Sequence, residues 1–501
     1  MTELKKLYRR SSSLFLVVGL VLLAVSLEWA QSPAPGVPGP VNADGASHSA
    51  PDHSPQNKES DAGTTQEKKI SPQEAEELFH DVDQILEFAS KDTGLPVKKE
   101  VKRRLTSRDE VVAYLEKSMA DDKDAQRLRR SELVLKKFGL LPRDFDLQTF
   151  LVALLREQVA GYYDPKTKTV NLLDWIDIEQ QRPVLAHELT HALQDQSFGL
   201  KKWLKAGSTH LDDKKQPTAA DLENDEISEA RQAVVEGQAM VVLVDYMLAP
   251  TGKSILASPQ IAEALKEGML AGTADSVQFK NAPIFLKEEL TFPYRYGLDF
   301  ETELLRARGK EKAFAEVLGN PPRTTRQIME PKTYLSGEIV EPMRLPDLQR
   351  DFKNYQRFDV GEMGEFDVAI LVDQYAGKDA ALQIYPRWRG GYYYAARPKG
   401  DPTAPLALLY VSRWSGPEAA AEFAAIYARS LAQRYRQVTE ADDEKQAVTL
   451  QNLVTLSGRH TWRTEEGPVV IAVEGNTVLI TESMDGPATQ GLERELLSTS
   501  H

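Results

Sequence analysis

One pentapeptide constrains the fold of this chain more than any other feature. It reads His187-Glu188-Leu189-Thr190-His191, so its two histidines are four positions apart. On an α-helix, residues four apart lie on the same face, and both imidazoles can therefore reach one metal ion. Glu188 follows the first histidine, where its carboxylate can reach a water molecule beside that ion. We therefore predict a helix that carries two metal ligands and a general base.

The alternative is a pair of surface histidines on an ordinary helix. The chain has only 8 histidines in 501 residues, so this spacing is seldom met by chance. A zinc ion that activates water needs three protein ligands and one open position, so a third ligand must come from another segment. Cysteine is absent, and Gln194 and Ser197 stand where the extended HExxHxxGxxH pattern has glycine and histidine. A carboxylate ligand remains.

Glu236 is the best candidate for this carboxylate. It lies in the middle of a strongly apolar helix predicted over about 226–248, where a charge is costly to bury unless it is paired or bound to a metal. Pairing with an arginine is the alternative. The adjacent Gly237 would let another backbone approach closely. The other acidic residues in this part of the chain are ranked lower: Glu229 is the fallback ligand, and Asp225 and Asp221 are weaker candidates.

A site that hydrolyses an amide also needs a donor to the developing oxyanion. Tyr294 and Tyr296 are the candidates, with Arg295 in reserve, and the alternative is an aromatic cluster that packs against the start of a helix. Asp195 lies one turn after His191. It is a candidate either for orienting a metal-bound imidazole or for a salt bridge.

Length and charge narrow the class of protein. A chain of 501 residues is long enough for two or three domains. The net charge of −14 argues against a nucleic-acid partner, because a polyanion is bound by a basic surface. No disulfide can form without cysteine. Nothing in the sequence specifies an oligomeric state.

The first 30 residues have the composition of an export signal. Lysines and arginines between positions 5 and 10 precede the uncharged apolar run Leu14–Leu27. This run is long for a signal-peptide core and short for a spanning helix of about 20 residues. We predict either a signal peptide, cleaved after Ser26 or Ala30, or a single N-terminal membrane anchor. In both cases the chain is expected in the bacterial envelope, periplasmic or anchored facing outward, or secreted.

Composition divides the rest of the chain into four parts. Residues 31–68 are rich in Pro, Gly, Ser and Ala and predict a disordered linker. Residues 69–157 predict a helical region, which begins at a capping box over 71–74. Residues 158–345 hold the pentapeptide, and residues 360–501 predict a C-terminal α+β domain. The fold class is therefore α+β.

Within these parts, local signals predict individual elements. Val159–Tyr163 and Thr169–Leu173 predict a β-hairpin, either as plain sheet structure or as an edge strand beside the metal to which an extended peptide can pair. Pro183 predicts the start of the pentapeptide helix and Gly199 its end. Residues 201–226 predict a solvated loop, and a later helix is predicted over about 295–318. Gly475-Asn476 predicts a tight hairpin turn between two strands.

The two-histidine pentapeptide followed by a glutamate on the next long helix resembles the gluzincin group of zincin metallopeptidases. More closely, the chain is similar to exported bacterial zinc metallopeptidases whose substrates are poorly defined. One departure is that many more positions separate His191 from Glu236 than in gluzincins, and an insertion at 201–226 would account for it. The segments that carry the similarity span roughly residues 155–340: GYYDPKTKTVNLL, VLAHELTHALQDQSFGL, VVEGQAMVVLVDYM, FPYRYGLDF and NPPRTTRQIMEPKTYL.

This resemblance implies a mainly helical, zincin-like metallopeptidase domain over 158–345. Zn²⁺ would be held by His187, His191 and Glu236. The implied activity is hydrolysis of peptide bonds in a peptide or protein substrate, with Glu188 as the general base. The alternative is a non-catalytic envelope protein that uses a zincin scaffold to bind a partner.

Overall fold

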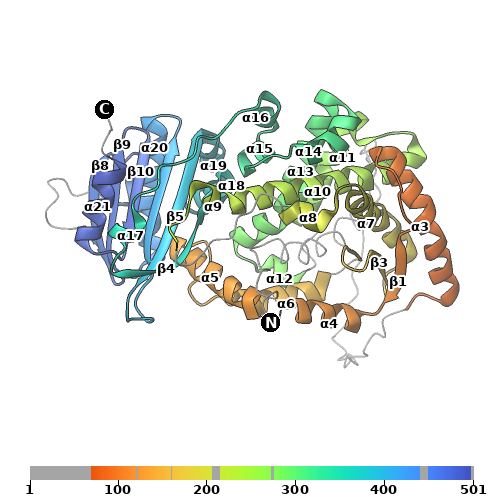
Figure 1. Ribbon diagram of the computed structural model, residues 1–501, viewed down its shortest axis with the longest axis horizontal. Helices are drawn as coiled ribbons and strands as arrows, with labels where there is room; N and C mark the ends of the chain where they lie inside the picture. The colour runs from red at the N-terminus through yellow and green to blue at the C-terminus, as the bar shows by residue number, and fades with distance from the viewer. Residues whose placement is uncertain are drawn as a thin grey trace, which may run out of the picture.

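The fold comes from a computed structural model, which describes residues 69–119, 122–158, 161–205, 215–271, 276–440 and 450–497. The export segment at 1–30 and the linker at 31–68 lie outside these residues. The fold is α+β, as predicted. Most of the described helices belong to the first two thirds of the chain and form one end of the molecule. A seven-stranded sheet from the last third of the chain lies at the opposite end (Figure 1).

Among the described residues, four helices lie between residue 69 and the pentapeptide helix, in the region that the sequence predicts to be helical. Ser71 and Glu74 form the capping box at the start of the first helix, and Gly94 ends that helix with a φ of 75°. The bounds are α3 (Pro72–Thr93), α4 (Arg108–Met119), α5 (Asp122–Phe138) and α6 (Leu147–Gln158).

A small three-stranded sheet lies beside the pentapeptide helix. The predicted hairpin consists of β2 (Tyr162–Asp164) and β3 (Thr169–Leu173), which pair antiparallel. Strand β1 (Lys102–Thr106), which the sequence analysis did not predict, pairs in parallel with β3. The order β1-β3-β2 leaves β2 at an edge of this sheet.

The pentapeptide helix α7 (Ile178–Phe198) begins earlier than predicted. Its N-cap is Asp177, and Pro183 lies inside the helix rather than at its start. The side chain of Gln181 bonds to the backbone of Leu173 and Ile176, which ties the first turn of the helix to the end of β3. Gly199 ends the helix in the left-handed conformation, as predicted.

The prediction of a loop over 201–226 is wrong for most of the residues that the structure describes there. Helices α8 (Leu200–Lys205) and α9 (Ala219–Leu222) lie in this segment, and α10 (Asn224–Leu248) begins within it. Apolar side chains of α8 explain the difference, since Leu200, Trp203 and Leu204 are buried.

Helices α10 and α13 (Ile284–Arg308) pack backbone to backbone along the centre of the molecule (Figure 1). A Cβ atom added at Gly237 would lie 2.2 Å from the carbonyl oxygen of Gly297, so glycine is required at this contact. The close approach that Gly237 predicted is therefore present. Helix α13 begins at Ile284 and not near 295, and it contains Pro293.

Shorter elements follow each of these two helices along the chain. Their bounds are η2 (Ala249–Thr251), η3 (Ile255–Ala257), α11 (Pro259–Ala271), α12 (Val277–Lys280), the π-helical η5 (Glu311–Glu316), α14 (Val317–Gly319), α15 (Thr325–Met329) and α16 (Pro331–Ser336). The stretch Asn224–Thr251 has the length and composition to cross a membrane, but 67% of its most apolar window is buried in the protein. A core helix has the same properties.

The C-terminal sheet has the order β4-β5-β6-β10-β9-β8-β7 and all its pairs are antiparallel. The predicted Gly475-Asn476 turn joins its strands β9 and β10, and Gly475 has a φ of 57°. Its strands are β4 (Tyr355–Glu362), β5 (Trp388–Pro398), β6 (Ala407–Trp414), β7 (Val438–Glu440), β8 (Gly458–Thr464), β9 (Gly467–Glu474) and β10 (Thr477–Glu482).

Helices cover both faces of this sheet. Helix α20 packs on β6, β9 and β10, whereas α17 and α21 contribute to the apolar cluster on the opposite face. The helices of this part are α17 (Leu348–Asp351), α18 (Glu365–Ala376), α19 (Lys378–Ile384), η6 (Tyr385–Arg387), α20 (Pro417–Arg434), η7 (Leu450–Asn452) and α21 (Gly486–Leu496).

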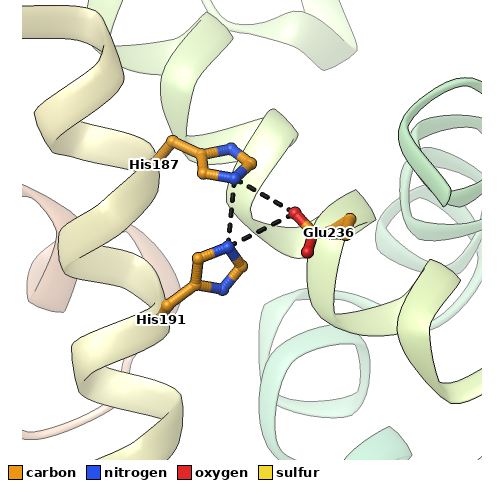
Figure 2. Close-up of side chains that lie close together, drawn as sticks. All are labelled: His187, His191 and Glu236. Carbon is orange, nitrogen blue, oxygen red and sulfur yellow. Dashed lines mark hydrogen bonds and ion pairs between the residues drawn. The ribbon is translucent and has the colours of Figure 1, made fainter. Parts of the chain in front are cut away.

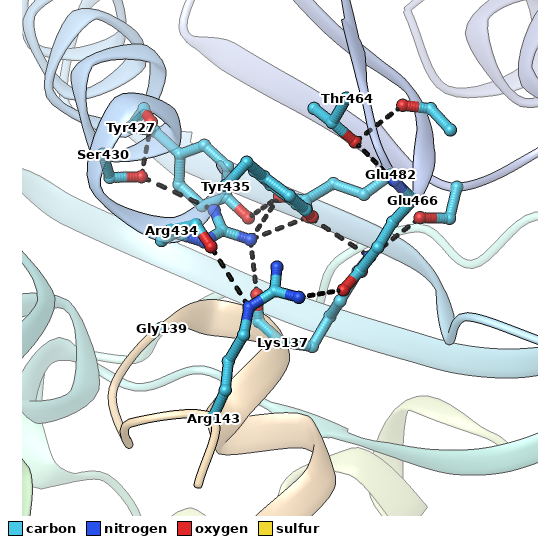
Figure 3. A network of polar contacts seen from close by, with 12 residues as sticks. Lys137, Gly139, Arg143, Tyr427, Ser430, Arg434, Tyr435, Thr464, Glu466 and Glu482 are labelled. Carbon is cyan, nitrogen blue, oxygen red and sulfur yellow. Dashed lines mark hydrogen bonds and ion pairs between the residues drawn. The ribbon is translucent and has the colours of Figure 1, made fainter. Parts of the chain in front are cut away.

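A buried ionic network joins α5 to the C-terminal sheet (Figure 3). The carboxylate of Glu482 accepts hydrogen bonds from the Arg434 guanidinium at 2.7 Å and from the Tyr427 hydroxyl at 2.7 Å. Lys137 of α5 lies 3.7 Å from Glu482 and 2.8 Å from Glu466. Burial opposes the charge of Glu482, but Arg434 and Lys137 hold the pKa of its carboxyl below the usual range. The helical part and the sheet are thus held together by paired charges as well as by apolar contacts.

Candidate metal centre

Helix α7 presents the pentapeptide to the interior. Its exposed fractions are 1% for His187, 2% for Glu188 and 9% for His191, so these polar residues are buried. The two imidazoles lie one helical turn apart, and their Nε2 atoms are 3.0 Å from each other (Figure 2). The helix and the shared face that the spacing predicted are both present.

Helix α10 brings a carboxylate to the same point. Oε2 of Glu236 lies 3.1 Å from Nε2 of His187 and 3.3 Å from Nε2 of His191 (Figure 2). Zinc bonds of 2.0–2.1 Å in a tetrahedral arrangement place neighbouring ligand atoms about 3.3 Å apart. The three side chains therefore fit a divalent zinc ion. Among the described residues, this is the one set of three or more such groups that converges closely enough to hold a metal.

Each of the three side chains has a different hydrogen-bonding environment. Nε2 of Gln232 donates to Oε1 of Glu236 at 2.6 Å, which leaves Oε2 facing the histidines. Nδ1 of His191 lies 2.9 Å from Oε1 of Gln194. Nδ1 of His187 is buried without a hydrogen-bond partner among the described residues. Metal-bound histidines usually donate from their second nitrogen, so the two imidazoles are supported unequally.

The charges of the cluster shift its pKa values in both directions. Burial lowers the pKa of His187 to about 4, whereas Glu236 and Glu188 raise the pKa of His191 to about 9 against the effect of burial. Burial also disfavours the charged form of Glu236, but the two histidines hold its pKa well below the usual range. Glu236 therefore carries the negative charge that a metal ligand needs.

Glu188 lies beside the cluster without joining it. Its Oε2 accepts a hydrogen bond from the backbone N–H of Tyr163 in β2 at 2.7 Å. Burial raises the pKa of Glu188 to about 7, with a further increase from Glu236 and an opposing decrease from His191. A carboxylate with a pKa near neutrality can both accept and return a proton.

Helix α13 brings Tyr294 but not Tyr296 to this centre. The ring of Tyr294 stacks on that of His187, with centroids 6.2 Å apart. Burial raises the pKa of Tyr294 well above its usual value, and the charge of Glu236 and a hydrogen bond to it act in the same direction. Tyr296 instead packs against Phe292 and Phe366, so it does not occupy the position that the sequence analysis suggested.

The remaining candidates also lie away from the metal ligands. Arg295 pairs with Glu288 at 2.8 Å and lies over the ring of Tyr296. Asp221 accepts a hydrogen bond from Thr218. Glu229 faces the carboxyl group of Glu289, and Asp225 lies near that of Asp367. Alternative ligands are therefore not supported by the geometry.

Asp195 does not orient either imidazole. Its carboxylate accepts hydrogen bonds from the Tyr163 hydroxyl at 2.7 Å and the Leu200 backbone at 3.0 Å, and it forms a salt bridge with Lys168. Of the two predicted alternatives, the salt bridge is present. Asp195 thereby holds the β2–β3 hairpin against α7. The imidazole partner is its neighbour Gln194, which was noted only for its place in the extended pattern; an amide three residues after His191 on the same helix was the available signal.

A pocket that is partly open to solvent lies against the cluster. It lies where the hairpin, the pentapeptide helix, α10 and α13 meet. Its lining consists of Tyr163, Pro165, His187, Glu188, His191, Leu200, Gln232, Val235, Glu236 and Tyr294. His187, His191, Glu236, Glu188 and Tyr294 thus share one concave site.

Comparisons of the chain with family models, with curated proteins and with solved structures found no match. Function is therefore inferred from the residues of this pocket.

Proposed function

We propose that this protein is a zinc-dependent peptidase with a zincin-like core. One observation carries the proposal: the ligand atoms of His187, His191 and Glu236 lie 3.0–3.3 Å from one another, beside the carboxylate of Glu188. A metal site that served only as a scaffold would have no use for a buried carboxyl next to its ligands. Glu188 therefore favours an enzyme over the non-catalytic alternative.

The side chains of the pocket have separate roles in the proposed reaction. A zinc ion held by the three ligands would supply Lewis-acid activation of a water molecule and of the scissile carbonyl. The carboxylate of Glu188, aligned by the Tyr163 N–H, accepts the proton of the attacking water and returns it to the leaving amine. Tyr294 keeps its hydroxyl proton because its pKa is raised, so it can donate to the oxyanion.

The proposed substrate is an extended segment of a peptide or protein. Strand β2 is an edge strand and contributes Tyr163 to the pocket. An extended chain can add to such an edge through main-chain hydrogen bonds. This arrangement would lay a peptide bond across the pocket rather than beside it.

We also propose that the protein is exported to the bacterial envelope or secreted. The support is the positive segment followed by the apolar run Leu14–Leu27. Sequencing the N-terminus of the mature protein by mass spectrometry tests this proposal. A mature chain that begins near residue 27 or 31 supports a signal peptide, and an intact N-terminus in the membrane fraction supports an anchor. An intact N-terminus in the cytoplasmic fraction would refute both.

The Glu188→Gln variant separates an enzyme from a zinc-binding scaffold. We expect this variant to keep its zinc and to lose about 10²–10⁴-fold in kcat, because Gln cannot accept the water proton. Metal content and cleavage of a peptide library, with and without a chelator, are the measurements. Glu179→Gln, an exposed carboxylate on the same helix, is the matched control and should keep full activity. Undiminished turnover by Glu188→Gln would remove this residue from the mechanism, and no chelator-sensitive cleavage by the parent protein would favour the scaffold.

A further inference from the structure

A row of buried hydrogen bonds runs from the metal centre to η5. Nδ1 of His191 lies 2.9 Å from Oε1 of Gln194, and Nε2 of Gln194 donates to Oε1 of Gln238 at 2.8 Å. Nε2 of Gln238 donates in turn to the carbonyl oxygens of Ala313 at 2.8 Å and Phe314 at 3.3 Å. The exposed fractions of the two glutamines are 1% and 0%.

Backbone carbonyl groups determine which end of each glutamine amide donates and which end accepts. A carbonyl oxygen can only accept, so the NH₂ group of Gln238 must face η5. The NH₂ group of Gln194 faces the carbonyl oxygen of Val235 at 3.1 Å for the same reason. The amide oxygen of Gln194 therefore faces His191 and can only accept. Nδ1 of His191 must carry the proton.

The consequence lies at the metal centre. A neutral imidazole, the form that binds a metal, has a free lone pair on Nε2 when its proton is on Nδ1. Nε2 of His191 is the atom that converges with His187 and Glu236. The row thus fixes both the tautomer and the ring orientation that a metal ligand requires. His187 has no equivalent support, because its Nδ1 is buried without a partner in the described part of the chain.

Packing alone does not account for two glutamines at these positions. Gln194 and Gln238 are almost fully buried, and a buried amide is costly unless its hydrogen bonds are complete. Here every amide group has a partner, and the last partners are carbonyls of the π-helical η5.

We propose that Gln194 and Gln238 are positioning residues for the metal centre and that zinc affinity depends on them. This inference rests on the proposed metal site, and it extends that site from three ligands on α7 and α10 to a row that ends on η5. Gln194 acts directly on His191, and Gln238 acts by keeping the Gln194 amide in its orientation.

Zinc affinity tests the proposal, measured by competition with a chromophoric chelator. Gln194→Leu should weaken zinc binding by about 10–100-fold, as expected when the partner of a metal-bound histidine is lost. Gln238→Leu should weaken it by a smaller factor. The visible spectrum of the cobalt-substituted protein should change in both variants, because the orientation of the His191 ring is no longer fixed.

Gln181→Leu is the matched control. Gln181 is a glutamine on the same helix, 2% exposed, and its amide bonds to the backbone of Leu173 and Ile176 far from the ligands. This variant should lower the melting temperature of the metal-free protein but leave zinc affinity and the cobalt spectrum unchanged. An equal loss of affinity in Gln181→Leu would show a general structural effect and overturn the proposal.

The possible failures are distinguishable. Gln194→Leu and Gln238→Leu variants that bind zinc as tightly as the parent protein would overturn the positioning role alone. A parent protein that binds no zinc would overturn the proposed function itself. If Gln194→Leu does not fold, Gln238→Leu interrupts the same row one link further from the metal and gives the decisive affinity.

Discussion

Helix α10 carries two clusters of ionisable groups two turns apart, and the residues that surround its glutamates differ between them. Glu236 meets two histidines, and the three ligand atoms converge. Glu226 and Glu229 instead face carboxyl groups from three other elements, α13, α18 and β4. This second group, the carboxyl cluster, consists of Asp225, Glu226, Glu229, Glu289, Glu362 and Asp367.

The neighbours of each glutamate set its charge. Burial and the nearby carboxylates together raise the pKa of Glu226 to about 8 and that of Glu289 to about 8. Burial and neighbouring carboxylates also raise the pKa of Glu229 well above its usual value. A protonated carboxyl is a poor metal ligand. A buried glutamate on an apolar helix therefore indicates a metal site only when imidazoles, and not further carboxyls, surround it.

Removal of the metal should have the largest effect on stability. A ligand that binds only the folded state contributes about 4 kcal/mol when its free concentration is 1,000 times its Kd. We therefore expect a chelator to lower the melting temperature of the parent protein and of Glu229→Gln by similar amounts. Glu236→Ala should show almost no chelator-dependent shift, as monitored by calorimetry. A full shift in Glu236→Ala would place the metal elsewhere.

Zinc affinities of two matched variants test the same difference between Glu236 and Glu229. Glu236→Gln should weaken zinc binding by more than about 100-fold, because loss of a ligand exceeds the 10–100-fold cost of losing a supporting hydrogen bond. Glu229→Gln, the matched substitution two turns earlier, should bind zinc as the parent does. Competition titration gives both values. The opposite ranking would make Glu229 the third ligand.

The carboxyl cluster should produce a smaller, pH-dependent effect. In the unfolded chain a glutamate releases its proton near pH 4.5, whereas the folded protein holds the protons of Glu226 and Glu289 to about pH 8. The stabilisation is therefore complete below pH 4.5 and is lost as pH rises through 8. Glu229→Gln removes one titrating group and can still donate to Glu289. It should raise the free energy of unfolding at pH 8, relative to pH 5, by about 1–2 kcal/mol.

Chemical denaturation at pH 5 and pH 8 measures this difference. Glu474→Gln, which changes an exposed glutamate at the β9–β10 turn, is the control and should leave the pH dependence unchanged. Equal pH dependence in Glu229→Gln and the parent protein would show that the cluster does not hold protons in the folded state.

Local sequence signals predicted the parts of the fold that depend on local interactions. Ser71 and Glu74 cap α3 through bonds between residues three apart, and Gly475 supplies the positive φ of a tight turn. The cap and the turn can each be predicted from a few neighbouring residues. The parallel pairing of β1 with β3 joins Lys102 to Thr169. Since β1 has the polar sequence KRRLT, nothing in its own residues indicated a strand.

In the site too, the features that depend on local spacing were predictable, and those that depend on packing between helices were not. The spacing within one helix gave His187, Glu188 and His191, and the cost of a buried charge favoured Glu236. Glu229 lies on roughly the same face of α10, so only the packing of α7 against that helix separates the two. Likewise, Tyr294 lines the pocket from a position one turn before Gly297, where α13 packs backbone to backbone on α10 at Gly237. Tyr296, two residues later, packs elsewhere because helical residues two apart do not share a face.

The most direct test of the metal centre is the zinc content of the purified protein together with anomalous scattering from its crystals at the zinc absorption edge. We predict one zinc per chain and one anomalous peak, bonded at about 2.0–2.2 Å to Nε2 of His187, Nε2 of His191 and a carboxylate oxygen of Glu236. A zinc-replete crystal with no peak between these three side chains would contradict the assignment.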